Sequence, residues 1–265
     1  MTMPVLLQSL SNSGVLTLTM NRPAQRNALS EALMAAIEDA VTAAAEDRAV
    51  RVIVLKALGP AFCAGHDLKE MTAHWADADR GKAYFDSLFA KCSRMMQTLG
   101  EAPQPVIAAV NGIATAAGCQ LVATCDLAVA SEGAKFATPG VNIGLFCSTP
   151  MVALTRNVTR KHAMEMLLSG DMIEAREAER IGLVNRVVAE AALEETVGQL
   201  AERIAAKSAH TIAIGKRAFY QQIDKPLAEA YAIASEVMAR NMLSADAQEG
   251  ISAFIEKREP TWKDA

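Results

Sequence analysis

The segment that decides the fold reads AAVNGIATAAGCQLVATCD, from Ala108 to Asp126. It begins inside an apolar run, residues 105–110, that has the length of a buried strand, and the Asn-Gly pair at 111–112 predicts a turn. Small residues dominate positions 114–118, and an apolar helix begins among them. A helix that starts among small side chains leaves its first backbone N–H groups uncovered, and such groups can bind an anion. Tight packing of the helix against a strand requires the same small residues, so this segment alone leaves both interpretations open.

A second segment repeats the order of strand, turn and helix. The strand predicted over residues 50–58 is followed by Gly59-Pro60 and then by AFCAGHDLKEM, which starts at Ala61. Its Ala-Gly pair at 64–65 precedes a short helix, and Asp67 is the candidate N-cap of that helix. Two such turns can direct two backbone amides at one point, which is the form of an oxyanion hole.

Composition and charge exclude several classes of protein. The 265 residues are 51% hydrophobic and 21% charged, which allows one large domain, or a core with a smaller appendage. The net charge of −4 gives no basic surface for nucleic acid. No apolar run approaches the ~20 residues of a membrane span, and the N-terminal residues lack a secretory pattern, so we expect a cytoplasmic protein without membrane or nucleic-acid partners. The five cysteines show no paired spacing for a metal, so we expect reduced, mostly buried thiols and no metal site.

The remaining patterns predict alternating strands and helices, followed by helices alone. Residues 5–10 and 15–20 predict a β-hairpin, and Ser30 is the candidate N-cap of the next helix. A long helix is predicted over residues 78–99. From about Glu190 the pattern is almost continuously helical, so we predict a core of residues 1–190 and a helical C-terminal region of residues 191–265.

Five segments, which together span nearly the whole chain, resemble the crotonase superfamily, also called the enoyl-CoA hydratase/isomerase family. They are NRPAQRNAL from residue 21, AFCAGHDLKEM from 61, PVIAAVNGIATAAGCQL from 105, CDLAVASEGAKFATP from 125 and AFIEKRE from 253. The resemblance implies an α/β fold, in which a spiral of ββα turns is followed by C-terminal helices that mediate trimer contacts. Two trimers usually stack into a hexamer in this family.

The resemblance also implies an acyl-CoA site. It assigns the oxyanion hole to the backbone N–H groups of His66 and Ala117, which would polarise the thioester carbonyl and hold the enolate. Coenzyme A would enter as part of the substrate and not as a separate cofactor. The positions that match CoA contacts in the family are Arg22, Arg26, Ala28, Ala64, Lys69, Phe254 and Lys257, of which the last two often come from a neighbouring subunit.

Two positions depart from the pattern of the hydratases, which use two glutamates as acid and base. Gln120 and Gly140 stand where those glutamates are expected, and no Asp or Glu occurs between residues 133 and 150. Asn142 lies in the segment that lines the acyl pocket of the family, and it could orient a group without titrating. In the same segment, Cys147 has no evident partner base and is interpreted as a buried thiol, and Ser148 is a candidate helix cap. These sequences are most similar to a subgroup called enoyl-CoA hydratase domain-containing proteins.

Three hypotheses about function remain open. The first is an acyl-CoA lyase or isomerase of the enoyl-CoA hydratase type, active in acyl-CoA metabolism, with ordinary hydratase activity weakened by Gln120 and Gly140. The second is the decarboxylation of a malonyl-type acyl-CoA, for which the Gly-His-Asp triplet at 65–67 resembles methylmalonyl-CoA decarboxylases. The third is a non-catalytic acyl-CoA-binding protein. The sequence determines neither the acyl group nor the direction of the reaction.

Overall fold

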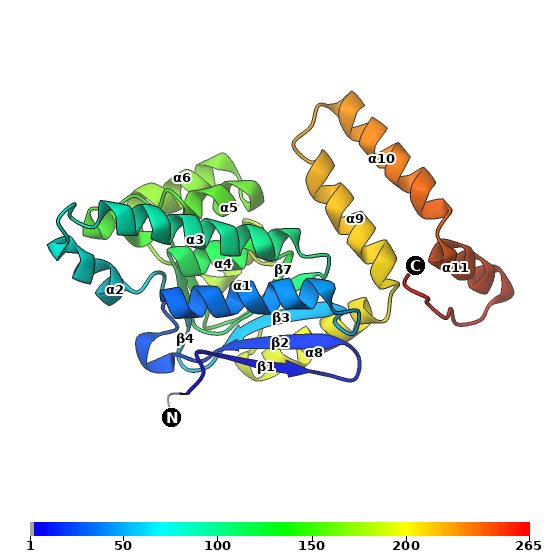
Figure 1. Cartoon of the computed structure of the whole chain (residues 1–265), viewed down its shortest axis with the longest axis horizontal. Helices are drawn as coiled ribbons and strands as arrows, with labels where there is room; N and C mark the ends of the chain where they lie inside the picture. Colours follow the sequence, from blue (N-terminus) through cyan, green and yellow to red (C-terminus); the bar gives the residue numbers. More distant parts are fainter. Residues whose placement is uncertain (1–2) are drawn as a thin grey trace.

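The computed structural model describes residues 3–265, which form an α/β fold with two β-sheets (Figure 1). The larger sheet has the strand order β1-β2-β3-β5-β7-β10 and the smaller sheet has the order β4-β6-β8-β9. The strands are β1 (Leu6–Leu10), β2 (Val15–Met20), β3 (Val52–Ala57), β4 (Ala61–Cys63), β5 (Val106–Val110), β6 (Ile113–Thr115), β7 (Leu127–Ser131), β8 (Lys135–Ala137), β9 (Ile173–Glu174) and β10 (Arg186–Val188).

The chain alternates between the two sheets, as a spiral of repeated units does. The pairs β3 and β4, β5 and β6, and β7 and β8 each place one strand in the larger sheet and the next strand in the smaller one. Within each sheet these successive strands are parallel, because each connection returns the chain to the same end of the sheet before the next strand begins. The predicted hairpin is confirmed, since β1 and β2 pair antiparallel with Leu6 opposite Met20.

Eleven α-helices and four 3-10 helices connect and cover the sheets within the described residues. The α-helices are α1 (Glu31–Glu46), α2 (Leu68–Ala73), α3 (Lys82–Glu101), α4 (Ala117–Thr124), α5 (Pro150–Asn157), α6 (Arg160–Ser169), α7 (Ala175–Arg180), α8 (Leu193–Ala205), α9 (Ala209–Gln222), α10 (Leu227–Met242) and α11 (Ala245–Glu256). The 3-10 helices are η1 (Pro23–Gln25), η2 (His74–Ala76), η3 (Pro139–Ile143) and η4 (Glu190–Ala192).

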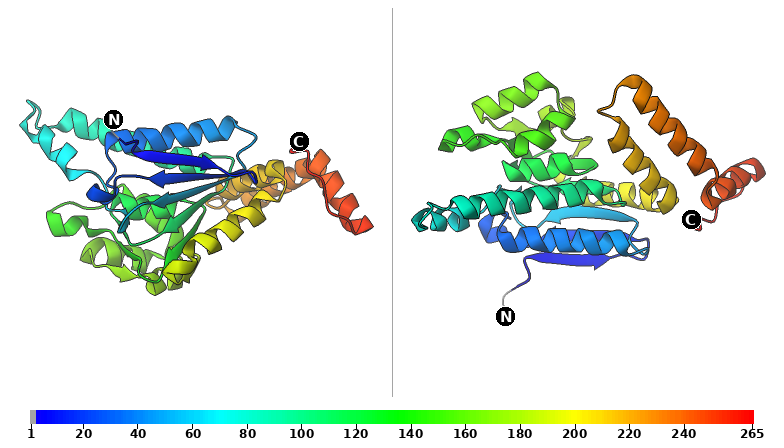
Figure 2. Two further views of the ribbon diagram at one scale, coloured as in Figure 1. Left: turned by 90° about the horizontal axis from the view of Figure 1, so that it is seen from below. Right: turned by 45° about the horizontal axis from the view of Figure 1, so that its top comes forward.

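Helices cover both faces of the larger sheet (Figure 2). The hydrophobic residues of α1, α3 and α4 join one face of the sheet in the main core. On the other face, Val52, Ile107 and Val129 pack with Leu193 and Val197 of α8, just after the predicted boundary at residue 190. Burial on both faces explains why β5 and the first four residues of β3 are continuous apolar runs instead of alternating ones.

The last three helices extend away from the sheets (Figures 1 and 2). The α9 helix is held to the core by Lys216, whose Nζ lies 2.6 Å from the Asp126 carboxylate, and by Tyr220, whose hydroxyl donates to the same carboxylate at 2.9 Å. The α10 helix then runs back alongside α9, and α11 lies at the end of the molecule opposite α2. No helix of residues 3–265 is long and apolar enough to cross a membrane.

Candidate active site

The first of the two turns follows β4 and is fixed to the start of α1 by main-chain hydrogen bonds. The Leu29 N–H donates to the Gly65 carbonyl at 2.8 Å, and the Asp67 N–H donates to the Leu29 carbonyl at 3.2 Å. Between these two bonds, the His66 N–H donates to no acceptor within residues 3–265. Asp67 caps α2 as predicted, because its carboxylate accepts from the Lys69 N–H at 3.1 Å.

The second turn joins β6 to α4 through Ala116. The backbone of Ala116 has φ 52° and ψ −119°, which lies outside the regions that alanine normally occupies. Its own N–H donates to the Ala137 carbonyl at 2.9 Å, and its carbonyl accepts from the Gln120 N–H at 3.0 Å. The next amide, that of Ala117, is the first of α4 and has no acceptor in the described part of the chain. Strain of this kind costs on the order of 1–3 kcal/mol and is typical of functional sites.

The two turns are in contact. A Cβ atom added to Gly65 would lie 3.0 Å from the Cβ of Ala116 and 3.6 Å from the backbone N of Ala117. In addition, the Thr115 hydroxyl donates to the Ala64 carbonyl at 3.2 Å. The structure therefore brings together two segments that are about 50 residues apart, each with an N–H group that no protein acceptor among residues 3–265 uses.

Close packing explains two of the glycines in the segment 108–126. A Cβ on Gly112 would lie 2.2 Å from the Pro60 carbonyl oxygen, and a Cβ on Gly118 would lie 2.0 Å from the Cys63 carbonyl oxygen. Both contacts are too short for any side chain, so the turn before β6 requires glycine beside Pro60, and the start of α4 requires glycine beside Cys63. Tight packing therefore accounts for Gly118 without any ligand, and the functional interpretation depends on the free amides instead.

The imidazole of His66 lies beside the first turn, near the Leu29 backbone. Both ring nitrogens are buried and make no hydrogen bond with residues 3–265. The ring stands edge-on to Phe89 of α3, with ring centroids 5.6 Å apart. Burial disfavours the charged form and outweighs the opposing effect of the Leu29 backbone nearby, so the pKa of His66 is lowered from 6.5 to about 4 and the ring is neutral at neutral pH.

Two more buried polar atoms near the second turn lack a partner in the described residues, namely Gln120 Oε1 and Thr138 Oγ1. Gln120 lies in the first turn of α4, three residues after Ala117. Thr138 directly follows β8, whose Ala137 carbonyl accepts from Ala116. The side chains of His66, Gln120 and Thr138 therefore place unpartnered polar atoms near the two free amides.

A folded-back loop fills the space at position 140. The Gly140 N–H donates to the Cys147 sulfur at 3.3 Å, and the Leu145 N–H donates to the Gly140 carbonyl at 2.9 Å. A Cβ on Gly140 would lie 2.8 Å from the Leu145 carbonyl oxygen and 3.0 Å from the Cys147 sulfur. A side chain at position 140 therefore requires the loop to move, and no pattern of neighbouring residues predicts this.

The polar residues of this loop are engaged in local contacts. Burial raises the pKa of the Cys147 thiol, which agrees with its interpretation as a buried thiol, and all five cysteines are buried and free. The Asn142 amide donates to the Gly170 carbonyl at 3.4 Å. The expectation that Ser148 caps α5 is wrong: Thr149 occupies the N-cap position, and the Ser148 hydroxyl donates to the Phe146 carbonyl at 3.4 Å. Within residues 3–265, no group of His, Cys, Asp and Glu could hold a metal ion.

The predicted CoA contacts fall into two separate groups. Near the first turn, the Ala64 N–H donates to the Arg26 carbonyl at 3.1 Å, Ala28 directly precedes Leu29, and Lys69 follows at the start of α2 with an exposed side chain. Arg22 is occupied instead, because its guanidinium donates to Asp67 at 2.9 Å and to the Ala28 carbonyl at 2.5 Å.

The second group, Phe254 and Lys257, lies at the far end of the molecule. Phe254 is 84% exposed in α11, and Lys257 is the exposed C-cap of that helix. Figure 1 shows α11 at the end opposite α2, so a single chain does not bring these two residues to the turns.

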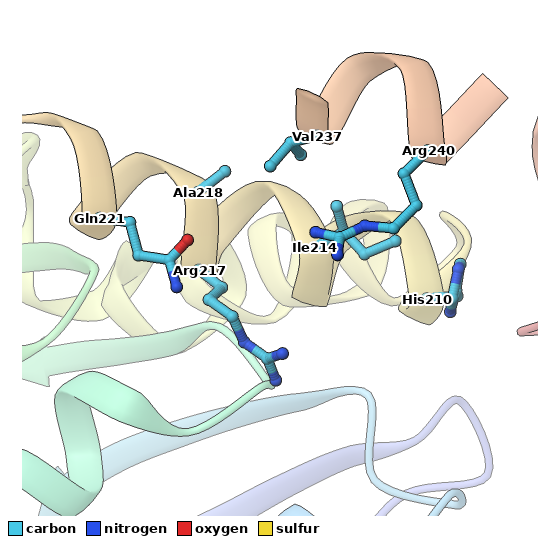
Figure 3. Close-up of a pocket in the computed structure, with 7 residues that line it drawn as sticks. All are labelled: His210, Ile214, Arg217, Ala218, Gln221, Val237 and Arg240. Carbon is cyan, nitrogen blue, oxygen red and sulfur yellow. The ribbon is translucent and has the colours of Figure 1, made fainter. Parts of the chain in front are cut away.

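A hollow lies between α9 and α10, away from both turns (Figure 3). It is lined by His210, Ile214, Arg217, Ala218, Gln221, Val237 and Arg240. Because all of these residues belong to the C-terminal helices, the hollow is not part of the candidate active site.

Comparison with known proteins gives consistent matches over almost the full chain. The family model for enoyl-CoA hydratase/isomerase matches residues 11–265. The rat protein "Enoyl-CoA hydratase domain-containing protein 3, mitochondrial" is 47% identical over 98% of this chain and 85% of its own length. The crystal structure of an enoyl-CoA hydratase from Mycobacterium smegmatis is 53% identical, with a TM-score of 0.93, and the match covers 98% of this chain and 99% of that one. The structure of human enoyl Coenzyme A hydratase domain-containing protein 3 is 44% identical, with a TM-score of 0.93, over 97% of this chain and 100% of that one.

These relatives contradict the prediction of a cytoplasmic protein. The matching domain-containing proteins of rat, mouse, human, Xenopus laevis and Danio rerio are all named as mitochondrial. Composition and folding pattern are a poor basis for predicting location, because targeting segments are separate from the residues that fold.

The similarity to domain-containing protein 3 agrees with the subgroup suggested by the sequence motifs, and the solved structures confirm the fold that the resemblance implied. The chain therefore belongs to the enoyl-CoA hydratase/isomerase family, whose members handle acyl-CoA, and it has the α/β crotonase fold with two mixed sheets and C-terminal helices.

Proposed function

We propose that this protein is an acyl-CoA enzyme that stabilises a thioester enolate between the backbone N–H groups of His66 and Ala117. The observation that carries the proposal is that both amides lack a protein acceptor within residues 3–265, although the turns that hold them are in contact. Ala117 is buried, and a buried amide without a partner is rare, because leaving a hydrogen bond unmade costs about 1–3 kcal/mol. A carbonyl oxygen placed between them would satisfy both.

Such a pair of amides favours the enolate over the thioester from which it forms. Removal of a proton from C2 moves negative charge onto the carbonyl oxygen, and fixed donors stabilise that charge more strongly than the neutral oxygen. Each donor of this kind is typically worth about 2.7–4 kcal/mol. The Ala117 N–H also lies at the N-terminus of α4, where the helix dipole adds partial positive charge.

The CoA moiety would bind along the first turn. Arg26 and Lys69 are the exposed cations beside it, and both can pair with phosphate groups. The backbone at Ala28 and Ala64 would contact the remainder of the ligand. Arg22 would act indirectly, since its bond to Asp67 holds the turn that carries His66.

The proposal includes weak hydratase activity. A hydratase needs groups that exchange protons with water and substrate, and Gln120 does not titrate near neutral pH. Gly140 has no side chain, and the loop fills the space that one would need. Because neither position carries a carboxylate, we expect a reaction in which stabilisation of the enolate contributes more than a carboxylate base does.

Decarboxylation of a malonyl-type acyl-CoA is the second candidate reaction. Loss of CO2 generates the enolate directly, so no carboxylate base is needed. The unpartnered hydroxyl of Thr138 favours this candidate, because a neutral hydroxyl can donate a hydrogen bond to a carboxylate. The third possibility, acyl-CoA binding without turnover, would use the same two amides.

A comparison of three ligands tests the oxyanion site. Calorimetry would measure the Kd of butyryl-CoA, of the matching thioether that lacks the carbonyl oxygen, and of a nitronate analogue that carries fixed negative charge at the same place. We expect the nitronate to bind at least about 10²-fold more tightly than butyryl-CoA, as an analogue of the charged state should, and the thioether to bind most weakly. Equal affinity for all three would contradict the proposal.

Turnover then separates the candidate reactions. Crotonyl-CoA and methylmalonyl-CoA would be supplied in parallel, and loss of enone absorbance or release of CO2 would be followed. Faster CO2 release favours the decarboxylase, and binding without either reaction favours the non-catalytic protein.

A further inference from the structure

Several buried polar atoms near the two turns have no hydrogen-bond partner in the described residues. The His66 ring nitrogens, Gln120 Oε1 and Thr138 Oγ1 all lack a partner within residues 3–265. Each of these residues is close in the chain, or through a main-chain contact, to the segment 115–117. Unmet buried hydrogen bonds cost about 1–3 kcal/mol each, so this concentration is unfavourable for folding alone.

Among these groups His66 alone can accept and return a proton. Glutamine and threonine side chains do not titrate near neutral pH. Cys147, a nucleophilic side chain in the loop that follows Gly140, is held as the neutral thiol because burial raises its pKa. The imidazole is also attached to the residue whose backbone N–H is proposed to hold the carbonyl oxygen, and C2 of the acyl group is bonded to that carbonyl carbon.

Resting on the proposed function, we propose that the His66 imidazole is the catalytic group that transfers the proton to and from C2 of the bound acyl-CoA, where other members of the family use a carboxylate. The lone pair of a neutral ring nitrogen takes the C2 proton. The electrons of the C–H bond form the C1–C2 double bond, and the carbonyl π electrons move onto the oxygen between the His66 and Ala117 amides. Return of the proton from the imidazolium to C2 reverses these changes.

The surroundings of His66 suit this task. The ring is neutral at neutral pH, and with a pKa of about 4 its basicity is close to that of an ordinary glutamate. The imidazolium that forms would be next to the enolate oxygen, and an opposite charge nearby stabilises a buried cation. The edge contact with Phe89 limits the orientations that the ring can adopt.

Hydrogen exchange at C2 measures this step directly. The protein would be incubated with butyryl-CoA in D2O, and deuterium incorporation would be followed by mass spectrometry. We expect His66→Ala and His66→Gln to slow exchange by about 10²–10⁴-fold, which is the usual contribution of a positioned general base. The Kd of butyryl-CoA should change little, because both variants keep the backbone N–H, and added imidazole should restore part of the exchange in His66→Ala.

His162→Ala serves as the matched control, since His162 lies on α6 and contacts only Thr159 and Arg180 through its ring nitrogens. It should exchange at the wild-type rate. The proposal is overturned if either His66 variant binds butyryl-CoA and exchanges C2 protons as fast as the wild type, or if the wild type binds butyryl-CoA without exchange. Failure of the wild type to bind any acyl-CoA would instead overturn the proposed function itself.

Discussion

At the scale of single residues, the chemistry depends on conformations that the sequence indicates only in part. Asp67 was predictable as a helix cap because the type and position of the residue suffice for that role. The positive φ of Ala116 was not predictable, because alanine has no preference for it and the strain is imposed by the contacts of β6 and α4. The missing partners of His66 were equally hidden, since they depend on what surrounds the ring in three dimensions.

The buried imidazole should make the stability of the protein depend on pH. The pKa of His66 is lowered from 6.5 to about 4 by burial, so between these values the unfolded chain binds a proton that the folded chain does not. The free energy of unfolding therefore falls as the pH falls through this window, and the stabilisation is fully present above it. Between pH 7 and pH 5 we expect a loss of about 2 kcal/mol from this group.

Urea unfolding at the two pH values would measure this loss, at one fixed protein concentration. His66→Phe keeps a ring beside Phe89 but cannot be protonated, so it should lose less stability than the wild type over the same interval. If the two proteins show the same difference between pH 7 and pH 5, the histidine is not the cause.

At the scale of elements, the sequence predicted local structure well and loop closure poorly. The hairpin, the helix capped by Ser30 and the strand that ends at Val110 follow from patterns of neighbouring residues, and all of them are present. The contact between the turns at Gly65 and Ala116 joins segments that are distant in the chain, so only the family resemblance anticipated it. The loop that returns Cys147 to Gly140 follows from neither, because it depends on backbone contacts within one irregular segment.

The loop between Gly140 and Cys147 changes what we expect when glutamates replace Gln120 and Gly140. The wild type should hydrate crotonyl-CoA at least about 10²-fold more slowly than an ordinary family hydratase, since a positioned acid or base contributes that much. From the sequence alone, Gln120→Glu together with Gly140→Glu should recover activity. In the structure a Cβ at position 140 meets the Leu145 carbonyl oxygen at 2.8 Å, so the second change should distort the loop instead.

Loss of the enone absorbance of crotonyl-CoA would measure hydration in the wild type, in Gln120→Glu and in the double variant. Gly140→Ala adds only the offending Cβ, and it should lower the free energy of unfolding by about 1–3 kcal/mol, the usual cost of an overfilled site. Wild-type turnover equal to that of a family hydratase would mean that other groups supply the protons.

At the scale of the whole molecule, one chain separates features that the resemblance places at a single site. The turns at His66 and Ala117 lie in the body of the fold, whereas Phe254 and Lys257 lie on α11 at the opposite end of the molecule from α2. If these two residues contact CoA, they must do so in another copy of the chain. No sequence pattern within a single chain can reveal such an arrangement, because the contact joins two molecules.

The α10 helix carries a surface that fits such an assembly. Leu227, Tyr231, Met238 and Met242 are 75%, 68%, 62% and 48% exposed, and their spacing places all four on one stripe of the helix. Large apolar side chains gathered on one exposed face are typical of protein interfaces. We therefore expect a trimer or a hexamer in which this stripe is covered.

Sedimentation at micromolar concentration would test the assembly, with Tyr231→Glu and Met238→Glu combined in one variant. Two buried carboxylates would be costly in an apolar interface, so the variant should sediment as a monomer. Its circular dichroism should stay close to that of the wild type, because both side chains are exposed within the single chain. The control is Glu236→Gln, which lies on the opposite side of α10 and should leave the oligomer intact. A wild type that stays monomeric would remove the proposed role of Phe254 and Lys257, and an unchanged oligomer in the double variant would place the interface elsewhere.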